Sequence, residues 1–259
     1  MRKKYALLFV LIGLVLLLAG CTEYDQPITS ESEGIWNEIF VYPLSWVITK
    51  IAQIFGNSYG LSIIIVTIFI RLVLLPLNVK QIKSSRAMQE IQPKLQEIQK
   101  KYSSKDANTQ QKLQQETMKL MQEYNVNPLA GCLPILVQMP ILIAMYHAIV
   151  RTEEISNYSF LWFQLGSPDY VLPFLTAGFT FLQSKLMMST NTSVNSNPQV
   201  AMQMKMMLYV MPIMIGVMAF MFPAALALYW VTGNIFMVIQ TLLINKPMMA
   251  KNNNGGVKK

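Results

Sequence analysis

The sequence predicts an all-α polytopic membrane protein, with a core of five transmembrane helices, a cytoplasmic helical hairpin and an outer interfacial amphipathic helix. Three observations support this fold class. Hydrophobic residues make up 53% of the 259 positions and charged residues only 13%. Five apolar stretches approach or exceed the length of a membrane crossing. Lysine and arginine are concentrated in two segments, the pattern expected of cytoplasmic regions.

Residues 1–20 have the features of a bacterial lipoprotein signal peptide. An apolar run follows three cations and ends in Ala19-Gly20-Cys21, which resembles a lipobox, where the cysteine is lipidated and becomes the new N-terminus. An ordinary signal peptide or an uncleaved anchor is the alternative. If Cys21 is acylated, Cys132 is the other cysteine of the chain, so the sequence predicts neither a disulfide framework nor a metal cluster.

Residues 21–58 are predicted to be an extracellular, lipidated N-terminus followed by an amphipathic helix. Apolar side chains between 35 and 55 recur at helical spacing with few charges, as in helices that lie in the membrane interface. The predicted turn into the first span consists of Asn57, Ser58 and Gly60.

Five predicted spans and their connections follow. Pro173 and Pro212 are expected to interrupt the third and fourth spans, which are short for a crossing. Phe222-Pro223-Ala224-Ala225 is expected to form a tight turn between the last two spans. The spans are 59–79, 129–150, 171–187, 207–222 and 224–245, joined by an extracellular loop at 151–170 and a cytoplasmic loop at 188–206, and followed by a basic tail at 246–259.

The distribution of charge predicts the orientation in the membrane. Residues 80–127 hold nine Lys or Arg against five acids, a net +4, and the tail after residue 245 adds four lysines. The segment from Cys21 to Gly60 holds one cation against five acids, and 151–170 holds one against three. The positive-inside rule therefore places 80–127 and the tail in the cytoplasm. An outer, lipidated N-terminus followed by five spans gives the same orientation.

The cytoplasmic segment 80–128 is predicted to be a helical hairpin. Apolar residues recur at alternating three- and four-residue steps in both arms, and Ser103-Ser104-Lys105-Asp106 supplies the break and an N-cap. Pro93 is expected to kink the first arm or to mark a new helix start. A plain solvated face is the ordinary interpretation of the lysines, and contact with anionic lipid or ribosomal RNA is the alternative.

Arg71 is a positive charge within an otherwise apolar predicted span. A charge at this depth costs at least ~2.5–3.5 kcal/mol, so it is expected to face a hydrated cavity, a partner or a function. Its Cα–Cβ bond tilts toward the outer face whereas the nearer interface is cytoplasmic, so snorkelling is unfavourable. The other four spans contain no acid. The sequence therefore predicts a counter-charge from outside the spans: an anion, a lipid or a substrate peptide.

Polar side chains recur in the predicted spans and are expected to line a hydrated groove around this cation. For each one taken singly, the alternative is a hydrogen bond between helices, at about 0.6 kcal/mol. The predicted groove residues are Arg71, Thr67, Asn78, Gln138, Thr180, Gln183, Trp230, Asn234 and Gln240.

The chain lacks the residue sets that are typical of enzymes. Its one histidine, His147, is near a span end, and the sequence contains no nucleophile–base set and no phosphate-binding loop. The sequence therefore predicts no catalytic residue, no metal site and no cofactor.

Three motifs, together with Arg71, resemble the YidC/Oxa/Alb family of membrane protein insertases. The resemblance covers about residues 35–250. The lipobox and the absence of a large outer domain resemble the Gram-positive branch, the SpoIIIJ-like YidC of bacilli. The motifs are Glu90-Ile-Gln-Pro-Lys-Leu-Gln-Glu97 in the hairpin, Asn127-Pro-Leu-Ala-Gly-Cys-Leu-Pro-Ile-Leu-Val-Gln-Met-Pro140 entering the second span, and Phe222-Pro-Ala-Ala-Leu-Ala-Leu-Tyr-Trp-Val-Thr-Gly-Asn234 joining the fourth span to the fifth.

The resemblance implies a five-helix core around a hydrophilic groove that is open to the cytoplasm and the lipid and closed outside. Arg71 matches the family's groove arginine, and Gln138, Gln183, Trp230 and Gln240 fall at or near groove positions. It also implies clients: nascent membrane proteins with one or two spans, such as the ATP synthase c subunit, inserted alone or with the Sec translocon. The ribosome and membrane lipids are the other expected partners.

Two other classes of function stay open from the sequence. An anion transporter or channel would use Arg71 as its anion site, although five spans without an internal repeat argue against it. A structural scaffold would make the charge at position 71 dispensable. In each case the expected location is the bacterial plasma membrane, with a lipid-anchored outer N-terminus and a cytoplasmic C-terminus.

Overall fold

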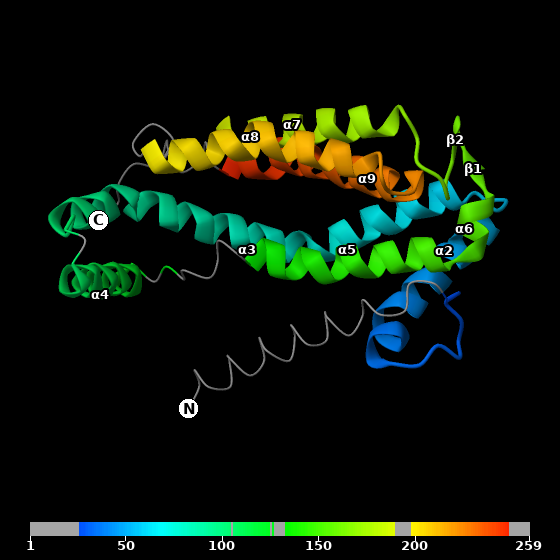
Figure 1. Cartoon of the computed structure of the whole chain (residues 1–259), viewed down its shortest axis with the longest axis horizontal. Coiled ribbons are helices and arrows are strands. Elements are labelled where there is room, and N and C mark those ends of the chain that lie inside the picture. Colours follow the sequence, from blue (N-terminus) through cyan, green and yellow to red (C-terminus); the bar gives the residue numbers. More distant parts are fainter. Residues whose placement is uncertain (1–25, 105, 125, 127–132, 190–197, 249–259) are drawn as a thin grey trace. The chain divides into compact units, whose positions relative to one another are not determined.

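The computed structural model describes residues 26–104, 106–124, 126, 133–189 and 198–248, which are mostly helical (Figure 1). The apolar composition and helical periodicity of these segments account for this, and the all-α fold class is confirmed at this level. Several predicted features lie outside the described residues: the signal peptide 1–20, the lipidation site Cys21, Cys132, part of the loop 188–206 and most of the tail 246–259.

The N-terminal described segment forms a helix where an amphipathic helix was predicted. A π-helical turn, η1 (Asn37–Val41), leads without a break into α2 (Tyr42–Ile54), and Pro43 lies in the first turn of α2. The helix ends at Ile54 and is followed by Gly56 and Asn57, whose φ angles of 67° and 64° are left-handed. The predicted turn residue Gly60 instead lies inside the next helix.

That next helix, α3 (Tyr59–Lys101), is continuous over 43 residues. It includes the predicted first span and the first arm of the predicted hairpin, so no new helix begins at Pro93. A proline removes one intrahelical hydrogen bond, but Ile91 and Leu95 on either side of Pro93 are buried against other side chains. This packing is sufficient to keep the helix intact, because tertiary contacts override local propensity.

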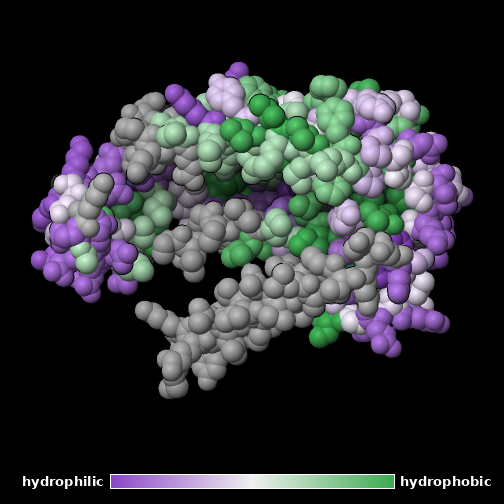
Figure 2. Space-filling view, in the orientation of Figure 1, coloured by the Kyte–Doolittle hydropathy of each residue, from purple (hydrophilic) through white to green (hydrophobic). Residues whose placement is uncertain are grey.

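Helix α4 (Ala107–Glu123) packs against the last turns of α3. Leu120 of α4 and Val126 just beyond it form a buried cluster with Ile91 and Leu95 of α3. The carboxylate of Asp106 accepts a hydrogen bond from the Thr109 N–H at 2.8 Å, which is the predicted N-cap. Figure 2 shows hydrophilic residues over the rest of α4 and the adjoining end of α3.

The remaining helices differ from the predicted spans at their ends. Pro173 lies in the first turn of its helix and does not interrupt it, and the helix that contains Pro212 continues through this residue. The helix at the predicted fourth span, 207–222, begins earlier, at Pro198, because Lys205 lowers the hydropathy but does not end a helix. These elements are α5 (Leu133–Arg151), α6 (Glu153–Asn157), α7 (Leu172–Ser189), α8 (Pro198–Ala219), α9 (Ala224–Gln240) and the π-helical η4 (Thr241–Asn245).

The loop between α6 and α7 contains a short hairpin that an all-α prediction omits. Strand β1 (Ser159–Phe160) pairs antiparallel with β2 (Phe163–Gln164), with Ser159 opposite Gln164. Leu161 at the turn has a φ of 55°. Strands of two residues are too short to produce an alternating pattern, so they could not be predicted from the sequence.

The chain divides into two compact units, and five helices (α3, α5, α7, α8 and α9) contribute to both. The first unit contains the chain up to Phe69, Val137–Thr176 and Gly216–Gly233. The second contains Ile70–Leu136, Ala177–Ile215 and the chain from Asn234.

Two helical stretches among the described residues are long and apolar enough to cross a membrane. They are Tyr59–Lys101 and Ala224–Met248, while Leu136–Arg151 and Met204–Ala219 are shorter apolar helices. Apolar residues are visible over α8 in Figure 2, where Met214 and Val217 are exposed.

Candidate functional site

Arg71 lies on α3 at the border between a buried and an apolar exposed surface. The guanidinium-bearing side chain is half-buried in the second unit. Its neighbours Phe69, Leu72 and Val73 expose 64%, 52% and 60% of their side chains. The exposed apolar side chains beside this cation suit hydrocarbon, and the hydrated cavity expected around Arg71 stays a prediction.

A hydrogen bond joins two of the predicted groove residues directly. The Asn234 amide of α9 donates from Nδ2 to Thr180 Oγ1 of α7 at 2.7 Å, and Thr180 is buried. Gln183 lies three residues further along α7 and is half-buried. These side chains belong to the same unit as Arg71 and Asn78. The second unit thus contains most of the predicted groove set.

Gln240, at the end of α9, is the most deeply buried amide of this set. Its side chain is 3% exposed, and neither Nε2 nor Oε1 has a hydrogen-bond partner among the described residues. A buried polar group left in this state costs about 1–3 kcal/mol. The π-helical segment η4 follows immediately, and no feature of the sequence indicated it.

Three predicted groove residues belong to the first unit, where each makes a structural contact. Thr67 is fully buried and donates to the Ile63 carbonyl at 2.6 Å. Gln138 donates from Nε2 to Tyr229 Oη at 2.8 Å. The Trp230 ring lies 6.1 Å from that of Phe222, edge to face. The bond from Gln138 to Tyr229 joins α5 to α9, which fits the alternative of a hydrogen bond between helices, while the Thr67 bond lies within α3.

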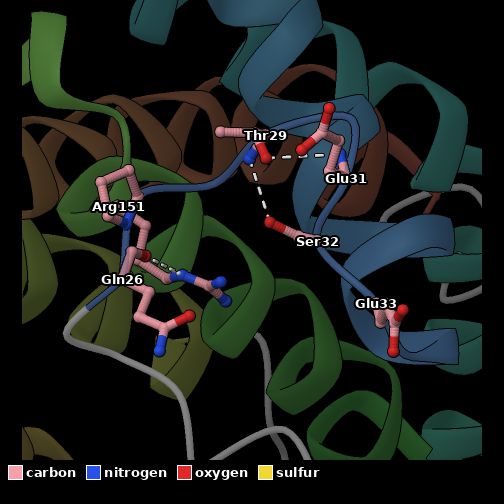
Figure 3. A pocket seen from close by; sticks show the side chains of 7 residues that line it. Gln26, Thr29, Glu31, Ser32, Glu33 and Arg151 are labelled. Carbon is pink, nitrogen blue, oxygen red and sulfur yellow. Dashed lines mark hydrogen bonds between the residues drawn. The ribbon is translucent and has the colours of Figure 1, made fainter.

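Sequence reasoning missed the role of Arg151, which it counted only as a loop cation. This side chain is 4% exposed and donates from Nε to the Gln26 carbonyl at 2.8 Å and from Nη1 to Asn37 Oδ1 at 2.7 Å. An arginine at the end of an apolar stretch was the available signal. Figure 3 shows the shallow pocket of about 530 Å³ at this place, lined by Gln26, Pro27, Thr29, Glu31, Ser32, Glu33 and Arg151.

The electrostatics of the α3–α4 region depend on two side chains. Lys94 donates to the Tyr124 hydroxyl, and this hydrogen bond raises the pKa of Lys94 above its usual value. Hydrogen bonds from Ser104 and Thr109 hold the pKa of the Asp106 carboxyl at about 2. Both groups are therefore charged at neutral pH.

The comparisons with known proteins decide the family. The family model described as 60Kd inner membrane protein matches residues 50–252. This chain belongs to that family. The membrane protein insertase YidC of Oceanobacillus iheyensis is 77% identical over 251 residues, which cover 97% of this chain and 100% of that protein. The membrane protein insertase MisCA of Bacillus subtilis is 56% identical over 254 residues, which cover 97% and 95%.

A solved structure of the family has the same fold. The active YidC insertase crystal structure with the first transmembrane domain resolved has a TM-score of 0.61 and 28% identity, and the match covers 82% of this chain. It covers 47% of the other chain, so this chain spans about half of that length. The family resemblance is thereby confirmed, and so is the bacterial plasma membrane as location. An anion transporter or channel receives no support.

Proposed function

We infer that this chain is a membrane protein insertase of the bacterial plasma membrane. The observation that carries this conclusion is the 77% identity to a membrane protein insertase, over the whole length of that relative. Arg71, the half-buried cation on α3, supplies a positive charge that can bind the polar part of a protein during insertion.

Arg71 is the proposed contact for the polar end of a client. A guanidinium makes strong, charge-assisted hydrogen bonds to carboxylates and to peptide carbonyls. A peptide entering hydrocarbon loses its hydrogen bonds to water, which otherwise opposes insertion. Arg71 lowers this cost for acidic or polar segments, and the apolar helix of the client then partitions into the bilayer without ATP.

The proposed groove is built on residues of the second unit. Arg71, Asn78 and Gln183 are half-buried there, so they are partly accessible. The hydrogen-bonded pair Thr180 and Asn234, which joins α7 to α9, belongs to the same unit. For Thr67, Gln138 and Trp230 a groove role stays a prediction.

The proposed topology has five spans, with the 80–128 segment and the tail in the cytoplasm. The clustering of lysine and arginine in these two regions supports it. Cys21 is the proposed lipid attachment point at the outer leaflet. Proposed clients are small proteins such as the ATP synthase c subunit, and the Sec translocon, the ribosome and anionic lipids are the proposed partners.

The test replaces Arg71 in cells depleted of their own insertase. Arg71→Ala is expected to reduce insertion of a c-type subunit by at least about tenfold, the effect of losing one charge-assisted hydrogen bond of about 1.5–3 kcal/mol. Arg71→Lys is expected to retain part of the activity because it keeps the charge. Lys83→Ala removes an exposed cation from the same helix and is the matched control. Full insertion by Arg71→Ala contradicts the proposal.

A further inference from the structure

The hairpin β1–β2 is attached to the first turns of two helices, α3 and α9, within the first unit (Figure 1). A Cβ at Gly60 in α3 would lie 2.1 Å from Phe160 Cγ, so the Phe160 ring packs directly on the α3 backbone. The Ala225 N–H of α9 donates to the Leu165 carbonyl, just after β2, at 3.0 Å. Of the described stretches, α3 and the one that begins with α9 are long and apolar enough to cross a membrane. The hairpin therefore lies at the level where both helices would leave the hydrocarbon.

The base of the hairpin is buried, whereas its tip is exposed. Phe163 and Leu165 are buried, but Leu161 and Trp162 at the turn are 72% and 57% exposed. Residues 155–168 contain no Lys, Arg, Asp or Glu. Turns that face water are usually built from small or polar residues. Adjacent large apolar side chains at an exposed turn instead indicate a contact with a membrane or a partner.

Leu161 also has a backbone conformation that is unfavourable for leucine. Its φ of 55° is left-handed, and it is the first residue of a two-residue turn between the paired Phe160 and Phe163. Gly, Asn or Asp normally occupy such positions. A bulky residue there is strained, and strain of this kind is retained mainly where it serves a function. Neither the strain nor the exposure of Leu161 stabilises the hairpin itself, but burial of its side chain in hydrocarbon would offset both.

We propose that Leu161 and Trp162 insert into the outer leaflet of the plasma membrane and anchor the loop 151–170 there. Leucine gains free energy from burial among acyl chains in proportion to its apolar area. An indole ring prefers the headgroup level, where its N–H can bond to lipid or water. Glu154 and Asp169 flank the uncharged segment, and their charges limit insertion to the tip.

Lipid, rather than another protein, is the occupant that the surroundings favour. Exposed apolar side chains follow the hairpin at Val171 and at Phe174, where α7 begins. The tip thus adds to the apolar surface of helices that are themselves in lipid. A protein interface would instead be expected to have a polar rim around its apolar centre. The proposal rests on the crossing of the membrane by α3 and α9, and it adds a lipid contact that is independent of client binding.

The fluorescence of Trp162 tests the proposal in the full chain, reconstituted into vesicles of phosphatidylglycerol and phosphatidylethanolamine. The emission of Trp162 is the difference between the wild type and Trp162→Phe. Quenching is measured with phospholipids brominated close to the headgroup, and separately with iodide on both sides of the membrane. Trp162 is expected to be quenched by the brominated lipid and protected from iodide. Gln114→Trp in the Trp162→Phe background places a tryptophan at an exposed position of α4 and is the control for access to water.

Leu161→Asn removes the apolar side chain and introduces a residue that tolerates a left-handed backbone. The equilibrium between lipid-buried and water-exposed tips is expected to shift toward water by at least about tenfold, the effect of losing the burial of one leucine. Iodide should then quench Trp162. The Tm in detergent is expected to stay equal or rise, because backbone strain is relieved.

Several results would overturn the proposal. If iodide quenches wild-type Trp162 as strongly as the control tryptophan on α4, the tip faces water. If neither quencher reaches Trp162, protein covers the tip, for example a second copy of the chain. Unchanged quenching in Leu161→Asn, or a lower Tm, would mean that Leu161 does not anchor the hairpin in lipid. None of these measurements involves a client, so they do not depend on the outcome of the insertion test with Arg71 variants.

Discussion

The polar residues around Arg151 and those around Gln240 are equally buried, yet their hydrogen bonding differs. Arg151 is 4% exposed, and its donors reach Gln26 and Asn37, which lie 125 and 114 positions away in the sequence. Gln240 is 3% exposed and has no partner among the described residues. Burial alone therefore does not mark a functional site. Satisfied hydrogen bonds indicate a scaffold, and unsatisfied ones indicate a place prepared for a ligand or water.

The largest expected effect is at Arg151. Arg151→Met leaves the Asn37 amide oxygen and the Gln26 carbonyl without their charged donor, and the expected loss of stability is about 3 kcal/mol or more. The measurement is the Tm of the full chain in detergent, with the exposed Lys50→Met as control. Insertion per folded molecule is expected to be unchanged. A variant of normal Tm that has lost insertion would break the comparison, because it would make Arg151 part of a site.

A second prediction concerns the close packing of the first unit at Gly60. A Cβ at this position would lie 2.1 Å from Phe160 Cγ, whereas a Cβ at Gly178 in α7 meets nothing within 4 Å. Gly60→Ala is therefore expected to destabilise the protein by about 1–3 kcal/mol, and Gly178→Ala to stabilise it by up to about 1 kcal/mol.

The measurement is the Tm of Gly60→Ala and of Gly178→Ala, each compared with that of the wild type. Adding Phe160→Ala to Gly60→Ala is expected to recover part of the loss, since the two residues are in contact. Equal Tm values for the two single variants would show that the loop at 151–170 does not hold the start of α3 tightly.

The hydrogen bond between Thr180 and Asn234 in the second unit is expected to contribute little to the free energy of unfolding. The double-mutant cycle of Thr180→Val and Asn234→Leu is expected to give a coupling of about 0.6 kcal/mol, the mean for such bonds between membrane helices. The coupling is measured from the free energies of unfolding, in detergent, of the wild type, the two single variants and the double variant. A coupling as large as the effect of Arg151→Met would remove the distinction between the two regions.

The smallest expected effect is at the exposed cap of α4. The pKa of Asp106 is lowered to about 2 from 3.8 by hydrogen bonds from Ser104 and Thr109. A lowered pKa stabilises the folded form above the unfolded value, so this contribution is complete above pH ~4 and is lost as the pH falls toward ~2. Exchange of the Thr109 amide, corrected for its intrinsic pH dependence, is expected to speed up in that window. Asp106→Asn is expected to abolish this pH dependence, and its persistence in the variant would refute the assignment.

The apolar stretches could be predicted from the sequence because burial in hydrocarbon requires long runs of apolar residues. Helix α7 (Leu172–Ser189) lies where the third span, 171–187, was predicted, and α9 begins at Ala224, the first residue of the last predicted span. Whether these helices cross the membrane stays a prediction. The N-cap at Asp106 was also predicted, because its chemistry is local.

Features that depend on tertiary contacts could not be predicted in this way. The continuation of α3 through Pro93 depends on packing by Leu120, which lies on another helix. The π-helical register of η4 leaves no mark in hydropathy, since α- and π-helices bury similar residues. The partners of Arg151 come from segments more than a hundred positions away. The polar candidate site residues could be identified from the sequence. Whether each of them forms a hydrogen bond depends on the folded structure, so this could not be predicted.

The length of α3 has a mechanical consequence. Twenty residues, or about 30 Å of helix, separate Arg71 from Ile91, where α4 is attached. Pro76 leaves the Leu72 carbonyl without its intrahelical donor, so the helix is expected to bend more easily just beyond the cation. Each 10° of bending there corresponds to about 5 Å of sideways travel at the far end. A displacement of α4 by several Å therefore requires only a small change of helix direction next to Arg71.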